Sequence, residues 1–99
     1  MPEPFEITLT EGAESDLRWF TAYAQRIIVD GTELHLRHQP TQGSRKIVAL
    51  RTNPIADWEL RLGDYRVLYR IDEALHIVTV EAIGEKRGNR LLVQGQEFT

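Results

Sequence analysis

Three charged side chains, Glu59, Arg61 and Arg66, have the types and the spacing to act on an anion. Glu59 and Arg61 alternate with apolar residues in WELRL, and Arg66 does so in YRVLYRI, which predicts two strands that each bury one face. Gly63-Asp64 between them suits a two-residue hairpin turn, and this loop length sets Arg61 directly opposite Arg66. Like charges across a strand pair are destabilising, so the placement needs a reason beyond stability, and one such reason is an anion such as phosphate held between the two guanidinium groups.

The polar face of this hairpin has two interpretations. Glu59 lies diagonal to Arg66 and Arg70 in the predicted register, so its carboxylate can relieve the repulsion or take a proton in catalysis. Alternatively, the face is an ordinary solvated surface on which long side chains splay apart. Both interpretations predict the same buried pairs across the hairpin, namely Leu62 with Tyr65, Leu60 with Val67, and Trp58 with Tyr69.

Length and composition limit the class of protein. We expect residues 1–99 to form a single domain, which is long enough for a core without disulfides or metal. The chain has no cysteine, which excludes a disulfide framework and thiolate zinc sites. No apolar run approaches the roughly 18 residues that a membrane span needs, and the first residues lack the pattern of a signal peptide. We therefore expect a soluble, cytoplasmic protein without membrane contact.

The charge is unevenly distributed along the chain. The net charge of −3 argues against a general nucleic-acid coat. Residues 1–36 hold seven acidic and two basic side chains. Residues 37–70 hold three acidic and seven basic side chains, and residues 71–99 hold five acidic and three basic ones. The basic middle third includes Arg45, Lys46 and Arg51, which can meet a nucleic-acid backbone or simply form a charged sheet edge.

Two helices are expected after a short strand at residues 5–9. Thr10 can cap a helix that begins at Glu11. Its apolar stripe is Ala13, Leu17, Phe20 and Ala24, and the second helix, which ends before Pro40, has the stripe Ala24, Ile27, Ile28, Gly31 and Leu34. Glycine costs helix stability, so Gly31 indicates a close approach to a neighbouring element.

Strands dominate the rest of the predicted fold. Residues 45–51 read as an extended segment before the hairpin, and residues 75–83 as a strand whose core face carries His76, Val78, Val80 and Ala82. His76 is expected to be a hydrogen-bonded core histidine. Gly84 ends this strand in the prediction, and residues 85–90 form a basic loop. His35 and His38 lie one helical turn apart, but no third ligand supports a metal site.

The whole pattern resembles the RelE/ParE superfamily of bacterial type II toxins. The resemblance spans roughly residues 5–93 and is carried by GDYRVLYRID and by the IGEKRGNR stretch. It implies an α+β fold with an N-terminal strand, a two-helix hairpin and then an antiparallel sheet of three or more strands. It also implies a cognate antitoxin as partner, in a toxin–antitoxin hetero-oligomer. The RelE-like branch cleaves mRNA on the ribosome, whereas the ParE-like branch inhibits DNA gyrase.

The resemblance assigns roles residue by residue. Arg66 falls at the motif arginine that contacts the scissile phosphate, Arg61 at a basic position of the preceding strand, and Glu59 two positions earlier on the same face. Lys86 or Arg87 matches the basic residue after the last strand's glycine. The implied chemistry is attack of an RNA 2′-hydroxyl on the adjacent phosphate, with Glu59 as base and with neither metal nor cofactor. The implied RNA-binding residues are Arg45, Lys46, Arg51, Arg87 and Arg90.

One departure from the family pattern keeps two alternatives open. Active relatives often place a Tyr or His a few residues beyond the last glycine, where this chain has Arg90-Leu91-Leu92. The chain is also acidic overall, which is unusual for a toxin that docks into ribosomal RNA. A ParE-like gyrase inhibitor and an inactive relative that retains antitoxin binding are therefore the alternatives to a RelE-like nuclease.

Overall fold

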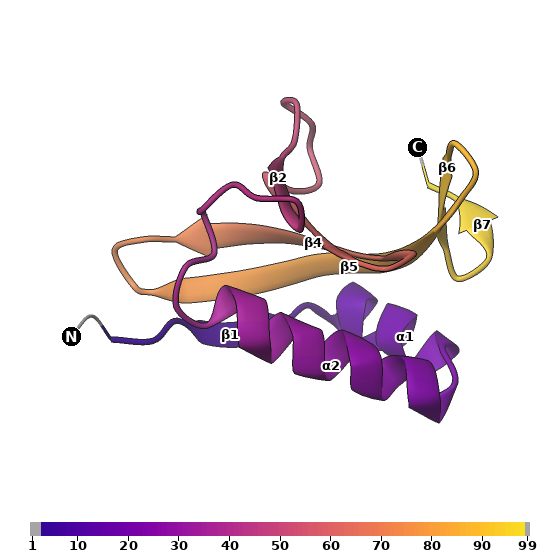
Figure 1. The fold of residues 1–99 in the computed structure, drawn as a ribbon, viewed down its shortest axis with the longest axis horizontal. Coiled ribbons are helices and arrows are strands. Elements are labelled where there is room, and N and C mark those ends of the chain that lie inside the picture. Colours follow the sequence, from indigo (N-terminus) through magenta and orange to yellow (C-terminus); the bar gives the residue numbers. More distant parts are fainter. Residues whose placement is uncertain (1–2, 99) are drawn as a thin grey trace.

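The computed structural model describes residues 3–98, in which two helices cover one face of a curved sheet (Figure 1). The elements in chain order are β1 (Glu6–Leu9), α1 (Glu11–Trp19), α2 (Ala22–Leu36), β2 (Ile47–Ala49), β3 (Trp58–Leu62), β4 (Tyr65–Asp72), β5 (Ile77–Arg87), β6 (Arg90–Val93) and β7 (Gln96–Glu97). The sheet order is β2-β3-β4-β5-β6-β7, with antiparallel neighbours, and β1 pairs in parallel with β5. The predicted α+β architecture is confirmed. No helix among the described residues is long and apolar enough to cross a membrane.

The β3–β4 hairpin has the register predicted from its sequence. Arg61 pairs with Arg66, and the buried pairs are Leu62 with Tyr65, Leu60 with Val67, and Trp58 with Tyr69. Gly63 has a φ of 60°, and Asp64 beside it does not have a positive φ. This combination fits a type II′ turn, whose twist matches that of the flanking strands.

Each helix begins at a threonine cap. The Thr10 hydroxyl accepts from the Ala13 amide at 3.1 Å, and the Thr21 hydroxyl accepts from the Ala24 amide at 3.2 Å. The chain ends α1 at Trp19 and doubles back, so that α2 returns along the sheet, as the predicted helix hairpin requires (Figure 1). The two helices therefore form one layer against the sheet.

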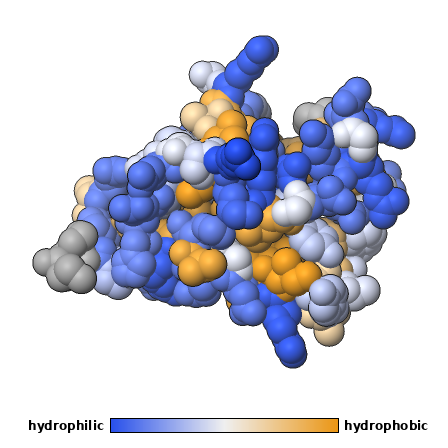
Figure 2. Space-filling view, in the orientation of Figure 1, coloured by the Kyte–Doolittle hydropathy of each residue, from blue (hydrophilic) through white to orange (hydrophobic). Residues whose placement is uncertain are grey.

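The buried face of α2 differs from the predicted one at its end. Its buried residues recur every four positions, at Ala24, Ile28, Thr32 and Leu36. Leu34, which was predicted in the core stripe, is 75% exposed, and Figure 2 shows apolar side chains reaching the surface along α2. The prediction for Gly31 is confirmed, because a Cβ there would lie 2.6 Å from the Leu62 methyl groups.

A β-bulge changes which side chains of β5 reach the core. Leu68 pairs with Ala82 but Tyr69 pairs with Val80, so Glu81 is the extra residue. A bulge residue shifts the alternation of a strand by one position. The prediction that Ala82 lies on the core face is therefore wrong, because Ala82 packs with Leu68 on the other face.

The predicted ends of the same strand are also wrong. His76 precedes β5 in a turn, with a φ of 54°, and its ring stacks on Phe5 at a centroid distance of 4.4 Å. Its Nδ1 is buried without a hydrogen-bond partner among the described residues, so it is not the hydrogen-bonded histidine that was expected. At the other end, β5 continues through Gly84 to Arg87 and pairs with β6. Residues 85–87 thus belong to a strand and not to a loop.

A buried tyrosine joins the sheet to the segment after α2. Tyr69 is completely buried, and its hydroxyl donates to the Pro40 carbonyl at 2.5 Å. Burial raises the pKa of the Tyr69 phenol well above its usual value, because ionisation would place a charge in the core. The contact fixes the start of the segment that leads to β2.

Tyr69→Phe is expected to lower the free energy of unfolding by about 1–3 kcal/mol at neutral pH, because the buried Pro40 carbonyl loses its donor. The folded-state pKa of Tyr69 is raised, so the unfolded chain releases this proton first, above pH of about 10. Wild-type stability should therefore fall above that pH more than the stability of Tyr69→Phe. Urea unfolding at pH 7 and pH 10.5 measures both effects, with exposed Tyr23→Phe as the control. A Tyr69→Phe protein that is as stable as wild type would contradict this assignment.

Candidate functional site

A charged depression lies on the sheet face that points away from the helices. Its lining comes from β3, from β4 and from the β5–β6 hairpin. Its volume is about 190 Å³. The side chains that line it are Glu59, Arg61, Arg66, Lys86, Asn89, Arg90 and Leu91. The structure thus brings together the four residues that were predicted to be catalytic.

Arg66 is a buried charge without a carboxylate partner. The residue is only 8% exposed, and its Nη1 donates to the carbonyls of Gly63 at 2.6 Å and Tyr65 at 2.9 Å. No carboxylate of the described residues lies within ion-pair distance of it. A buried guanidinium group is costly unless an opposite charge compensates it. The turn carbonyls orient the group, and its charge remains for an anion in the depression.

Glu59 pairs with the arginine beside it on the same strand. The Arg61 Nε lies 2.8 Å from Glu59 Oε2, while Glu59 Oε1 makes no hydrogen bond within residues 3–98. Glu59 pairs with Leu68 and therefore lies diagonal to Arg66 and Arg70, as predicted. The Arg70 guanidinium group makes its ion pairs with other carboxylates, namely Asp57 at 3.4 Å and Glu81 at 3.8 Å. One oxygen of Glu59 is therefore available to a ligand.

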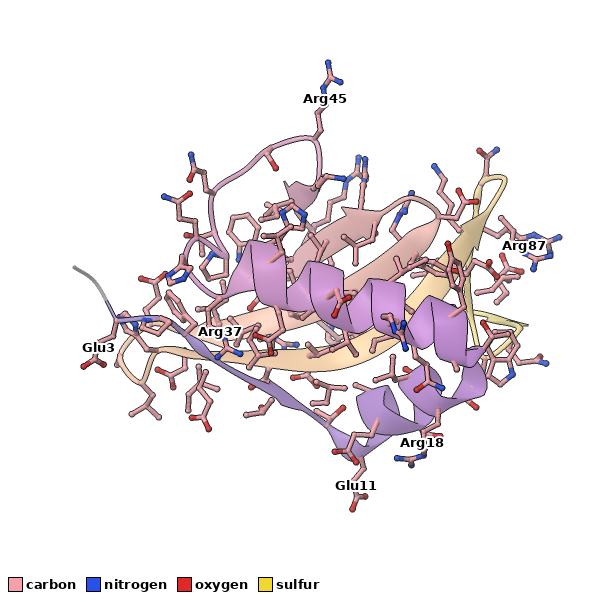
Figure 3. The ribbon with its side chains drawn as sticks, turned by 60° about the horizontal axis from the view of Figure 1, so that its bottom comes forward. Glu3, Glu11, Arg18, Arg37, Arg45 and Arg87 are labelled. Carbon is pink, nitrogen blue, oxygen red and sulfur yellow. The ribbon has the colours of Figure 1, made fainter. Side chains whose placement is uncertain are left out.

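Lys86, and not Arg87, enters the depression from β5. The Lys86 amide donates to the Asp64 carbonyl at 2.7 Å, which fixes this part of β5 beside the β3–β4 turn. Successive side chains of a strand point to opposite faces. Arg87 accordingly points outward at one end of the molecule (Figure 3) and bonds to Glu85 at 3.3 Å. The structure thus separates the two residues that the sequence left as alternatives.

The other predicted RNA-binding residues have different positions. Arg90 lines the depression and lies 3.7 Å from Glu97. The Lys46 carbonyl accepts from the Arg61 amide at 2.7 Å, which places Lys46 beside β3, but Lys46 does not line the depression and its contact with RNA stays a prediction. Arg45 extends away from the body on the loop before β2 (Figure 3), and Arg51 is exposed after β2. Neither Arg45 nor Arg51 lines the depression, so their contact with RNA stays a prediction.

Asn89 and Leu91 line the site but were not singled out from the sequence. They follow Gly88, which has a φ of 60° and begins a two-residue turn between Arg87 and Arg90. The R-G-N-R stretch carries the signal of a hairpin, which would have placed both residues beside β5.

Gly84 lets β6 approach β5 closely at the edge of the site. It pairs with Arg66, and a Cβ at this position would lie 2.6 Å from the Leu92 carbonyl oxygen and 3.1 Å from the Leu91 Cδ1. Glycine inside a strand often marks such a close backbone approach. The absent side chain keeps the β6 residues next to the depression.

The side chains that line the depression can bind an anion and can take part in a proton transfer. Four cationic side chains surround one carboxylate with a free oxygen, and the described lining contains neither His nor Tyr. Within residues 3–98, no cluster of three or more His, Asp or Glu side chains could hold a metal ion. The arrangement can bind a phosphate and accept a proton close to it.

Two solved structures are similar to this chain. One, described as the toxin–antitoxin complex RelBE2 from Mycobacterium tuberculosis, contains a chain with 25% identity and a TM-score of 0.71, over 84% of this chain and 99% of that one. The other, an archaeal RelE–RelB complex from Pyrococcus horikoshii OT3, gives 16% identity, a TM-score of 0.66, and coverage of 86% and 97%. No protein-family model and no curated protein matches the sequence. The two structures confirm the predicted RelE-like resemblance. The likeness to the Pyrococcus horikoshii structure is one of fold alone.

Gly84→Ala is expected to destabilise the protein by about 1–3 kcal/mol, because the added methyl group must push the β6 backbone away from β5. Thermal unfolding measures the loss. Gly43→Ala is the matched control, since its nearest heavy atom would be 4.0 Å away, at the Ile47 carbonyl. Equal stability of the two variants would show that β6 does not depend on this close approach.

Proposed function

We propose that this RelE-like chain is the toxin of a bacterial type II toxin–antitoxin system and inhibits translation by cleaving mRNA on the ribosome. The RelE-like neighbours support the toxin assignment. The observation that carries the nuclease assignment is the buried, unneutralised Arg66 beside Arg61, Lys86 and Glu59. The cations can stabilise the charge of a phosphate transition state and the carboxylate can accept a proton, which together allow RNA cleavage without a metal.

Arg61 and Arg66 would bind the scissile phosphate. Arg66 is held by the turn carbonyls and needs no reorganisation to donate its remaining N–H groups. Arg61 lies directly across the hairpin, so the two guanidinium groups can contact different oxygens of one phosphate. Charge accumulates on these oxygens in the transition state, and preorganised donors stabilise it there.

Glu59 and Lys86 would handle the protons. The free oxygen of Glu59 takes the proton of the RNA 2′-hydroxyl as O2′ attacks the adjacent phosphorus. The bond from phosphorus to O5′ breaks, and the Lys86 ammonium group supplies a proton to the departing oxygen. The products are a 2′,3′-cyclic phosphate and a 5′-hydroxyl end. Lys86 takes the place that His or Tyr would hold, because the described lining has neither.

The proposed partners follow from the same comparison and from the site. The similar structures are toxin–antitoxin and RelE–RelB complexes, so we infer a protein antitoxin that binds this chain as well. The ribosome and its bound mRNA are the partners of the reaction itself. A shallow, open depression cannot by itself hold RNA in line for attack, and the ribosome would supply that constraint.

Inhibition of DNA gyrase is the second candidate function. The observation that favours it is the absence of His and Tyr from the described lining of the depression. Loss of gyrase supercoiling activity in the presence of excess protein, together with intact mRNA on the ribosome, would establish it in place of the nuclease.

Arg61→Ala/Arg66→Ala is expected to abolish mRNA cleavage, because both phosphate ligands are removed. Primer extension on a reporter mRNA in a reconstituted translation reaction detects the cuts, and a reaction without ribosomes tests the dependence on them. The matched control is Arg18→Ala/Arg26→Ala, which removes the same charge from exposed positions on the helices. Cleavage that survives in the site variant contradicts the proposed function.

Glu59→Gln is expected to lower the cleavage rate by about 10²–10⁴-fold, the usual contribution of a general base. The amide retains the shape of the side chain but cannot accept the 2′-hydroxyl proton. Single-turnover cleavage on programmed ribosomes measures the rate. Glu14→Gln, which alters an exposed carboxylate 3.9 Å from Arg18, should cleave like wild type. A Glu59→Gln rate close to that of the control would exclude Glu59 as the base.

A further inference from the structure

An apolar hollow of about 230 Å³ adjoins the charged depression on the same sheet face. Its apolar lining comes from the segment after β2, from β4, from β6 and from the end of the described residues, namely Leu50, Pro54, Ile55, Leu68, Leu91 and Phe98. Two residues, Glu59 and Leu91, line both the hollow and the depression. The two spaces are therefore neighbours along one surface.

The walls of the hollow are held in place by the protein's own hydrogen bonds. Asn53 Oδ1 accepts from the amides of Ile55 at 2.8 Å and Ala56 at 3.1 Å, and its Nδ2 donates to the carbonyls of Arg51 and Ala56. On the other side, the Phe98 amide donates to the Leu91 carbonyl at 2.8 Å. The hollow is thus formed without a ligand, and Asn53 has no hydrogen-bonding capacity left for one.

The order of cations, carboxylate and apolar walls along the sheet matches the order of groups within one nucleotide. Leu68 lies two residues from Arg66 on the same face of β4, which places their Cα atoms about 7 Å apart. Glu59 lies between the cations and the apolar walls, because it lines both spaces. A nucleotide presents an anionic phosphate, a ribose and a base with apolar faces in this same order.

We propose that the hollow binds the base of the nucleotide whose 2′-hydroxyl attacks the scissile phosphate. The inference rests on the proposed function, since the phosphate must lie on Arg61 and Arg66 and the ribose on Glu59. The adjacent positive charge favours a nucleotide as the occupant over an apolar peptide side chain. The hollow recognises the base by the area of contact and not by hydrogen bonds, because Asn53 already uses all its hydrogen-bonding groups within the protein. The hollow therefore prefers a purine to a pyrimidine at the position immediately 5′ of the cut.

Small nucleotides test the hollow without the ribosome. The probes are 2′-deoxyadenosine 3′-phosphate and 2′-deoxycytidine 3′-phosphate, which lack the attacking hydroxyl, and inorganic phosphate. NMR titration of the labelled protein gives each dissociation constant and the residues affected. We expect the purine nucleotide to bind about tenfold more tightly than inorganic phosphate, with the pyrimidine between them. The nucleotides should shift the Ile55, Leu68 and Phe98 amides, whereas phosphate should shift only those around Arg66.

Ile55→Trp tests the assignment by filling the hollow. It should weaken purine nucleotide binding to the level of inorganic phosphate and leave phosphate binding unchanged, which also shows that the site remains folded. Leu75→Trp is the matched control, because Leu75 is 67% exposed in the β4–β5 turn. Ile55→Ser, which removes an apolar wall without adding volume, should weaken nucleotide binding in the same direction.

The outcomes separate this inference from the function on which it rests. Wild-type protein that binds the purine nucleotide no more tightly than phosphate, or Ile55→Trp that binds it normally, overturns the base site while leaving the phosphate site intact. An equal loss in Leu75→Trp also overturns it. Phosphate binding that is unaffected by Arg66→Ala contradicts the proposed function instead.

Discussion

The two-residue turn of the β3–β4 hairpin is the constraint on which both the core and the site depend. It fixes a register in which Leu60 and Val67 face the helices while Arg61 and Arg66 share the opposite face. A slip of β3 by one residue would turn its apolar side chains away from the helices and place Arg61 in the core. The apolar pairs therefore stabilise the facing arginines, whose mutual repulsion the hairpin would otherwise relieve by slipping. The core fixes the geometry of the site, and the turn carbonyls of Gly63 and Tyr65 orient Arg66 within it.

The sequence predicts the local parts of this arrangement and not the parts that depend on distant contacts. Alternation and turn chemistry suffice for the β3–β4 register because both signals lie within fifteen residues of chain, 58–72. The bulge at Glu81 could not be predicted from alternation, since β5 is apolar on both faces. A buried carboxylate on α1 supports the strand just after the bulge, where Asp16 accepts from the Ile83 amide at 3.1 Å. The sequence likewise identifies Glu59 and Lys86 as candidate site residues. Which side chains lie beside them depends on tertiary packing, which the sequence pattern does not show.

The distribution of ion pairs explains how an acidic chain presents a positive site. Most arginines at the margin of the sheet have a carboxylate nearby, as Arg70 has Glu81, Arg87 has Glu85 and Arg90 has Glu97. Such exposed pairs contribute little stability but cancel charge locally. Arg66, buried and without a carboxylate, is left as the concentrated positive charge of the depression. A mild net charge of −3 is thus compatible with strong local attraction for an anion.

The parallel ladder between β1 and β5 has a consequence for the order of events during synthesis. It joins the first strand to a segment near the end of the chain, where the Thr10 hydroxyl donates to the Glu81 carbonyl across 71 residues. Contacts this distant in sequence close late in folding, because their loop entropy must be overcome first. A nascent chain that emerges from the ribosome cannot complete the sheet until β5 has been made. Lys86 lies on β5 itself and Asn89, Arg90 and Leu91 follow it, so the depression is among the last parts of residues 3–98 to form.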